Sequence, residues 1–326
     1  MRESRSEDAK LTRLGLLAQA EPSPEMAAEL RQLIKNSSHH VVAQAAAIAA
    51  KGKLAEVADD LVAAFDRYLI EPLKSDKNCV GKIAIIDALN ELDDQRADVF
   101  LKGVRYVQME PRWGKFEDTA DAVRAGCAIG LVRIDYREVL PILVDLLNDD
   151  AQTVRIAAAQ SLAAHASEAA LLLLRLKSRL GDLRPEVVGE CLAGLMRVTP
   201  EESLAFVAEF LEHADAAIVE GALIALGNSH RPEAFEILRS YWQRNPHPDV
   251  RETTLLAISL LRLPAATDFL IVLVKHAPEP TAAEAIPALA IYFYDKQLRE
   301  RVAAVVKERS SRKLSSLFEE QCRDRD

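Results

Sequence analysis

Few of the features that mark the commoner protein classes are present in this sequence of 326 residues. Aromatic residues make up only 5% of the chain although 49% is apolar, so a core must be built from Ala, Leu, Val and Ile. Only 12 glycines occur, and no window alternates apolar and polar residues, which argues against a large sheet. The longest apolar runs, at 169–174 and 269–274, fall far short of the roughly 20 residues of a membrane span. These absences predict closely packed helices.

Cysteines are few, and acidic residues outnumber basic ones by 50 to 41. The four cysteines, at 79, 127, 191 and 322, show no CxxC spacing, which predicts small core residues rather than metal ligands or disulfide halves. The first residues, MRESRSEDAK, contain no apolar stretch, so no signal peptide is expected and the predicted location is cytoplasmic. A net charge of −9 disfavours a surface that neutralises phosphates and favours a protein partner.

A proline recurs every 32 residues, at Pro200, Pro232 and Pro264, and a similar apolar pattern follows each one. Proline has a fixed φ and no N–H, which suits the first turn of a helix, so each proline predicts the start of an equivalent helix. A fixed period of this length is typical of an array in which each unit is one helical pair.

The second helix of each unit is predicted by a frame of the form V-R-x-x-A-A-x-x-L. The frame is clearest at Val154, Arg155, Ala158, Ala159 and Leu162. Its first position recurs at 187, 218 and 250, and in the preceding part of the chain at 123, 80 and 41. Because positions i, i+4 and i+8 lie on one stripe of a helix, the frame predicts a buried stripe on every second helix.

The frame, an acidic residue six positions before its arginine, and an L-P-x-L-x-x-L-L run at 140–147 resemble the short HEAT-like repeats of bacterial proteins, a type shared by phycobilisome lyases. The resemblance implies an all-α fold: a right-handed α-solenoid of about eight antiparallel helix pairs with terminal caps. It also implies a ladder of acid–arginine contacts between neighbouring units. The residues that fit this ladder are Asp118, Arg124, Asp149, Arg155 and Arg251, with Asn245 in the place of the acid before Arg251.

A single array domain is expected over residues 1–326, with an N-terminal cap at 1–22, repeats at 23–295 and capping helices at 296–326. Tyr292, Phe293 and Tyr294 are concentrated near the end of the repeats. They either seal the last core layer, since a terminal repeat needs a cap, or form a homodimer contact.

About ten residues, 109–118, are inserted between the two helices of one unit. Two interpretations of the insertion stay open. Trp113 and Phe116 either fold down to plug the widened gap, which is the favoured interpretation, or Trp113 anchors a partner, because inserted loops often carry binding residues.

No catalytic set is recognisable in the sequence. It has no glycine-rich phosphate loop, no G-x-S-x-G, no Cys/His nucleophile pair, and none of the His-Glu dipeptides that hold iron in HEAT-like hydroxylases. The paired His39 and His40 lie at a predicted helix start without further metal-ligand types at helical spacing. Neither a metal nor a cofactor is therefore expected.

The second helices also have a face opposite their buried stripe, which in the HEAT-like family lines the concave side. In this chain the face carries apolar residues edged by acids, and it is either an exposed ridge for a partner or is buried by curvature. The candidate partner-binding residues are Ile129, Ile156, Gln160, Glu190, Glu220, Ile224, Glu252 and Leu256, together with Trp113 in the insertion.

The sequence therefore predicts a non-enzymatic scaffold that binds another protein along its concave face. One alternative is a HEAT-like lyase or chaperone that acts on a protein-bound cofactor. A nucleic-acid-binding protein, like the HEAT-like DNA glycosylases, is the less favoured alternative because the chain lacks phosphate-binding charge.

Overall fold

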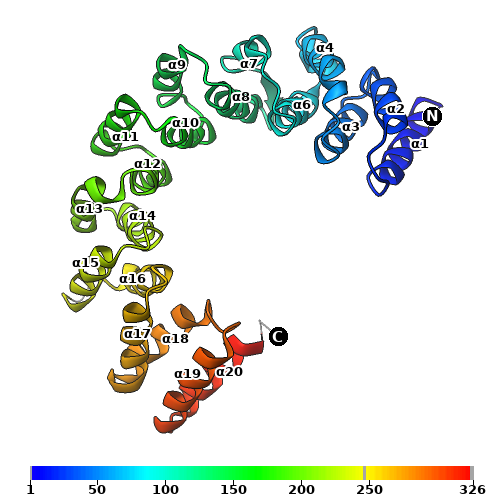
Figure 1. Ribbon diagram of the computed structural model, residues 1–326. Coiled ribbons are helices and arrows are strands. Elements are labelled where there is room, and N and C mark those ends of the chain that lie inside the picture. Colours follow the sequence, from blue (N-terminus) through cyan, green and yellow to red (C-terminus); the bar gives the residue numbers. More distant parts are fainter. Residues whose placement is uncertain (1, 245–246, 324–326) are drawn as a thin grey trace. The chain divides into compact units, whose positions relative to one another are not determined.

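The computed structural model describes residues 2–244 and 247–323, and in these residues antiparallel helix pairs stack into an all-α solenoid (Figure 1). The chain divides into two compact units, Met1–His165 and Ala166–Asp326. Asn245 lies outside the described residues. None of the described helices combines the length and the hydropathy that crossing a membrane requires.

In the described part of the first unit, α1 precedes four helical pairs. The second helices of these pairs (α3, α6, α8 and α10) pack side by side, each against the next. The elements are α1 (Arg2–Leu17), α2 (Pro24–Ile34), α3 (His39–Lys51), η1 (Ala55–Val57), α4 (Ala58–Tyr68), α5 (Pro72–Ser75), η2 (Lys77–Cys79), α6 (Val80–Glu91), α7 (Ala97–Gly103), α8 (Asp121–Arg133), α9 (Val139–Leu146) and α10 (Gln152–His165).

The described part of the second unit contains five helical pairs. Its second helices, α12 to α20 in even numbers, again pack each against the next, and Figure 1 shows the first helices α11, α13, α15 and α17 along their other side. The elements are α11 (Glu168–Leu180), α12 (Pro185–Val198), α13 (Pro200–Glu209), η3 (Phe210–Glu212), α14 (Ala216–Gly227), α15 (Pro232–Gln243), α16 (Pro248–Leu260), α17 (Pro264–His276), α18 (Glu279–Ala290), α19 (Lys296–Glu308) and α20 (Arg312–Arg323).

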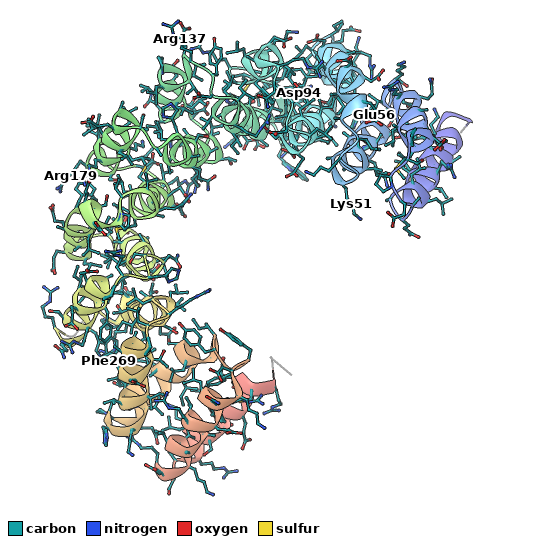
Figure 2. The ribbon with its side chains drawn as sticks, viewed as in Figure 1. Lys51, Glu56, Asp94, Arg137, Arg179 and Phe269 are labelled. Atoms are coloured by element: carbon teal, nitrogen blue, oxygen red, sulfur yellow. The ribbon has the colours of Figure 1, made fainter. Side chains whose placement is uncertain are left out.

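The helix starts predicted from proline are confirmed, because Pro200, Pro232 and Pro264 are the first residues of α13, α15 and α17. Neighbouring first helices meet through large side chains. Phe235 of α15 and Phe269 of α17 lie edge to face with their ring centroids 6.1 Å apart. Phe269 is labelled in Figure 2.

The second helices of the second unit approach one another far more closely. A Cβ added at Gly221 of α14 would lie 2.8 Å from the Cα of Gly189 in α12, and one at Gly227 would lie 2.6 Å from the Ala257 carbonyl oxygen of α16. Because real Cβ atoms do not approach backbone so closely, glycine at these positions is what lets the helix backbones touch.

The predicted buried stripe is confirmed in every unit but one. In α6 the predicted first residue, Val80, is half-buried, and the stripe lies one residue later at Gly81, Ile85 and Leu89. The first buried positions of the stripes on α3, α6 and α8 are therefore residues 41, 81 and 123. With this register, Lys82 takes the place that arginine has in other units.

Ion pairs with buried basic side chains lie along the second helices of the first unit. Arg124 contacts Asp118 at 2.6 Å and Asp149 at 2.9 Å, which confirms this part of the acid–arginine ladder. Lys82 forms a further rung with Asp76 at 2.9 Å, and both side chains are completely buried. Asp76 precedes Lys82 by the same six positions that separate Asp118 from Arg124, so one repeat geometry produces both contacts.

The insertion folds as a β-hairpin of β1 (Met109–Arg112) and β2 (Lys115–Asp118), and the sequence did not predict these strands. Trp113 and Gly114 form its two-residue turn with φ of 48° and 79°, as a tight hairpin turn of this kind requires. Trp113 is fully exposed at 102% and Phe116 is also exposed, so the plug interpretation is wrong.

The gap is filled instead by polar side chains on the other face of the hairpin. Glu110 is buried and accepts hydrogen bonds from the Asn78 backbone N–H at 2.5 Å, the Gln108 amide at 2.7 Å and the Thr119 hydroxyl at 2.9 Å. Successive residues of a strand point to opposite faces, so burying Glu110 leaves the apolar face of the hairpin in water.

The aromatic residues after α18 divide between core and surface. Phe293 is buried and packs edge to face on Phe318 of α20 at 5.2 Å, while the Tyr292 hydroxyl donates to the Ser259 carbonyl. Tyr294 is exposed. Phe293 therefore seals the last core layer against the final helix pair, as a terminal cap should.

Candidate functional site

A largely apolar hollow lies between three second helices of the second unit. Leu256 of α16, Ala283 and Pro287 of α18 and Leu317 of α20 line a groove with a volume of about 710 Å³, together with Glu252 of α16 and Lys313 of α20. A volume of this size is within the range of known ligand pockets, roughly 300–1,000 Å³.

Helical periodicity explains why these side chains meet. Leu256 lies six residues after Val250, the buried first position of α16, and six residues at 100° each bring it to the face opposite the buried stripe. Pro287 has the same place relative to Thr281 in α18 and is exposed inside the helix. Consecutive second helices therefore contribute one apolar residue each to a single surface.

Charge is distributed unevenly around this groove. Arg251 pairs with Glu284 at 3.0 Å and stacks over the Trp242 ring at 4.4 Å, so the charge of Glu284 is already compensated. Glu252 is exposed at the groove edge, and no described residue pairs with it. Lys313 is the one basic residue among those that line the groove in the described structure.

The candidate surface continues onto α14 and α12. Ile224 is half-buried at the position equivalent to Leu256, and Glu220 beside it accepts a hydrogen bond from Thr253 of α16 at 3.2 Å. On α12, Glu190 is half-buried and pairs with Arg197 at 3.2 Å. Glu220 and Glu190 are thus fixed by polar contacts beside the apolar residues of this surface.

The first unit places its candidate residues differently. Ile129 of α8 is 43% exposed and Gln160 of α10 is exposed, whereas Ile156 is half-buried. The one-residue shift of the stripe in α6 turns Ile86 into the core and puts Asp87 on the outside. An acid therefore interrupts the apolar ridge between α3 and α8, and the better groove is in the second unit.

Three groove residues were not predicted from the sequence, namely Pro287, Lys313 and Leu317. The frame is least regular in α18, and α20 belongs to the cap, so neither was assigned to the repeat surface. The available signal was the position of Pro287, because a proline inside a helical pattern is best tolerated where its face is open to solvent.

Trp113 is remote in sequence from the groove and stands on the hairpin of the first unit. Arg112 and Lys115 flank the turn and lie opposite each other in the register of the two strands. The Arg112 guanidinium donates a hydrogen bond to the Asn78 side chain at 2.8 Å. An exposed indole on an ordered hairpin can act as an anchor for a partner.

Reactive chemistry is scarce among the described residues, which contain no group of three or more His, Cys, Asp or Glu side chains that could hold a metal. Burial raises the pKa of the Cys79 thiol to about 11 and that of Cys191 to about 12, so both are core residues and not nucleophiles. Burial lowers the pKa of His39, with a smaller contribution from the adjacent His40. Both histidines lie in the first turn of α3, which Ser38 caps.

The stacked helical pairs and the buried stripe that recurs on the second helices define an α-solenoid built from repeats. The family model of HEAT repeats matches residues 115–178, 172–259 and 204–290, which together cover more than half of the chain. The protein belongs to the HEAT-repeat family.

Two solved structures show a looser likeness. The complex of CpcE and CpcF of phycocyanin lyase from Nostoc sp. PCC7120 is 18% identical over 77% of this chain and 94% of that chain, with a TM-score of 0.38. An engineered protein is 16% identical over 86% of this chain and 82% of its own, with a TM-score of 0.36. No curated protein matches the sequence.

Proposed function

We propose that the protein is a non-enzymatic scaffold and that the second helices of its Ala166–Asp326 unit bind a segment of another protein. The observation that carries this proposal is the groove between α16, α18 and α20, with apolar Leu256, Pro287 and Leu317 and an acidic edge at Glu252. An amphipathic helix or extended segment with basic flanks would complement such a groove.

The arrangement of charge supports a peptide in preference to a nucleic acid. The chain carries a net charge of −9, and the exposed carboxylate of Glu252 at the groove edge repels phosphates while attracting lysine and arginine. Ile224 and Glu220 extend the same chemistry onto α14, so a bound segment several turns long would stay in contact with it.

Affinity capture from the source cells tests the groove. The variant I224E/L256E puts charge into the apolar positions, and V272E is the matched control because Val272 is an exposed apolar residue of the first helix α17. We expect the control to capture the same partner as the wild type and the groove variant to lose it by at least about tenfold, since burying an unpaired carboxylate is costly.

A groove variant that stays helical and captures every partner of the wild type would contradict the proposal. Retention of a tetrapyrrole by the wild type and its loss in I224E/L256E would instead favour a lyase-like function. The scaffold is proposed to be bacterial and to act in the cytoplasm, which imaging of a tagged chain would check.

A further inference from the structure

The second helices α14, α16 and α18 run in the same direction and in register. Near the helix starts, Arg251 of α16 donates to the Thr281 hydroxyl of α18 at 3.3 Å. Near the helix ends, Ser259 of α16 donates to the Ala288 carbonyl of α18 at 2.5 Å. Buried positions coincide in all three helices. One set of equivalent buried residues is Ala222, Thr254 and Ala285, and the next, one turn later, is Leu226, Ile258 and Leu289.

The same register produces two rows of residues that cross the three helices on the face opposite the buried stripe. One row is apolar. The other consists of hydrogen-bond acceptors and lies four residues, about one turn, nearer the helix starts, so each acceptor is beside an apolar side chain. The apolar row is Ile224, Leu256 and Pro287, and the acceptor row is Glu220, Glu252 and the backbone carbonyl of Ala283.

Pro287 is the reason that Ala283 belongs to the acceptor row. In an α-helix the carbonyl of residue 283 accepts from the N–H of residue 287, and proline has no N–H to donate. Both Ala283 and Pro287 line the groove. A carbonyl without its helical donor is satisfied by another donor, so α18 offers an acceptor at the place where α14 and α16 offer carboxylates.

The negative charge of the acceptor row is not neutralised by any ion pair within the described parts of the chain. Glu252 is exposed, and Glu220 accepts a hydrogen bond from the Thr253 hydroxyl, which is uncharged. Glu284 lines the same groove, but Arg251 compensates its charge at 3.0 Å. Unpaired carboxylates beside apolar side chains complement a partner with both lysine or arginine and apolar residues.

The spacing of the helices selects the conformation of such a partner. The axes of packed helices lie about 8–10 Å apart, so each row repeats at this distance. A polyproline II segment has three residues per turn and rises about 3.1 Å per residue, so every third side chain points the same way at about 9 Å. A β-strand returns to the same face after about 7 Å, and an α-helix only after seven residues, about 10.5 Å. The extended segment with a period of three therefore fits best.

We propose that this face binds an extended segment that has one basic and one apolar residue in every three. The basic side chains meet the acceptor row, and the apolar side chains meet the apolar row. Lys313, which lines the groove on α20, repels a further basic residue, so the pattern spans three repeats. This inference rests on the proposed function and specifies the conformation and the sequence pattern of the partner.

Fluorescence anisotropy with synthetic peptides tests the pattern. The probe is Lys-Leu-Pro repeated three times, with blocked termini and a dye, and its control is a scrambled peptide of the same composition without the period of three. We expect the periodic peptide to bind the full-length chain at least about tenfold more tightly, because only its lysines and leucines reach both rows together. Equal affinity for the two peptides overturns the proposal.

Substitution of Glu252 tests the charge. E252Q should weaken the periodic peptide by about three- to tenfold and reduce the salt dependence of its binding, since one carboxylate is lost. The matched control is E168Q, because Glu168 is an exposed acid of the first helix α11 and should leave the affinity unchanged. Equal effects of E252Q and E168Q contradict a role for the acceptor row.

The variant P287V tests the carbonyl. Valine keeps an apolar side chain of similar size and restores the N–H that occupies the Ala283 carbonyl, so the periodic peptide should bind about fivefold more weakly. The variant should be at least as stable as the wild type, because proline is unfavourable inside a helix. Unchanged affinity in P287V overturns the role of the carbonyl.

Failure of this inference is distinguishable from failure of the proposed function. A peptide with lysine and leucine at helical spacing that binds more tightly than the periodic peptide, and loses affinity in I224E/L256E, overturns the extended conformation but keeps the groove as a binding surface. The inference is also overturned if the periodic peptide does not bind while I224E/L256E still loses the captured partner. If I224E/L256E binds every peptide and partner as the wild type does, the proposed function itself is overturned.

Discussion

At the scale of single residues, the completely buried pair of Lys82 and Asp76 has a large energetic consequence. Both side chains are removed from water, and the Lys82 ammonium also lies 5.4 Å from the Tyr106 ring centroid. Breaking a buried pair by removing one partner leaves an uncompensated charge and costs about 3–5 kcal/mol. We expect K82M to lower the unfolding free energy by that amount in urea titrations followed by circular dichroism.

The matched control is K102M. Lys102 pairs with Asp66 at 2.7 Å, but both side chains are over 40% exposed, so the loss should stay below about 1 kcal/mol. Equal losses in the two variants would show that Asp76 is satisfied by its backbone donors alone, the Gly81 and Lys82 N–H groups.

Glu110 makes the hairpin sensitive to acid. Burial alone would raise the pKa of its carboxyl, but hydrogen bonds from Gln108, Thr119 and Asn78 outweigh that effect and lower it. A lowered pKa in the folded state means that the stabilisation is complete above the unfolded pKa, about 4.3, and is lost as pH falls through the folded pKa.

The difference in unfolding free energy between the wild type and E110Q should therefore be constant above about pH 5 and shrink as the pH drops further. Urea titrations at a series of pH values measure it. A difference that stays constant down to about pH 3 would mean that the hydrogen bonds do not depend on the carboxylate charge.

Single residues also show where prediction from the sequence stopped. The acid–arginine rung at Asp118 and Arg124 was predictable because its motif is intact. The rung at Lys82 was not, because lysine replaces arginine and because the buried stripe of α6, which follows the left-handed Asn78 and Cys79, lies one residue later than the frame predicts. Trp113 was favoured as a plug of the gap that the insertion opens between two helices, whereas its place in a two-residue turn leaves it in water.

At the scale of elements, contact between the backbones of second helices controls the packing of the second unit. Alanine at position 221 would bring a Cβ to 2.8 Å from the Gly189 Cα, and backbone cannot give way as a side chain does. We expect G221A to destabilise the protein by about 1–3 kcal/mol through overpacking. Urea unfolding followed by circular dichroism measures the change.

A second alanine substitution separates packing from helix propensity. Apart from the backbone of α1 itself, nothing lies within 4 Å of the position that a Cβ at Gly15 would take, so G15A should be neutral or stabilise by up to about 1 kcal/mol. Stabilisation by G221A as well would show that α12 and α14 can move apart at little cost.

Most elements were predictable because each carries its own local signal. Proline set the start of three first helices, and spacings of four residues set the stripe on the second helices. The hairpin was not predictable, since its strands have four residues each and no alternation long enough to detect. Leu256 and Glu252 of the groove followed from the helical wheel, whereas Leu317 could be added only once α20 was seen beside α18.

At the scale of the whole molecule, the chain divides into two compact units, Met1–His165 and Ala166–Asp326. The regular repeat period gave no sign of this division. Each unit contains its own stacked second helices and its own buried apolar residues. A fragment of residues 166–326 should therefore keep its helicity and melt cooperatively, because helices in a solenoid are stabilised chiefly by their neighbours. Circular dichroism measures both properties, and a non-cooperative melt would argue that the second unit depends on the first.

The two tryptophans of the chain stand one in each unit and in opposite surroundings. The indole of Trp113 is already hydrated in the native protein, whereas that of Trp242 is covered by the Arg251 guanidinium. Unfolding can therefore change the fluorescence emission of Trp242 strongly, and that of Trp113 hardly at all. Intrinsic fluorescence is thus a spectroscopic probe of one half of the molecule, and its unfolding curve should depart from the dichroism curve whenever the halves unfold separately.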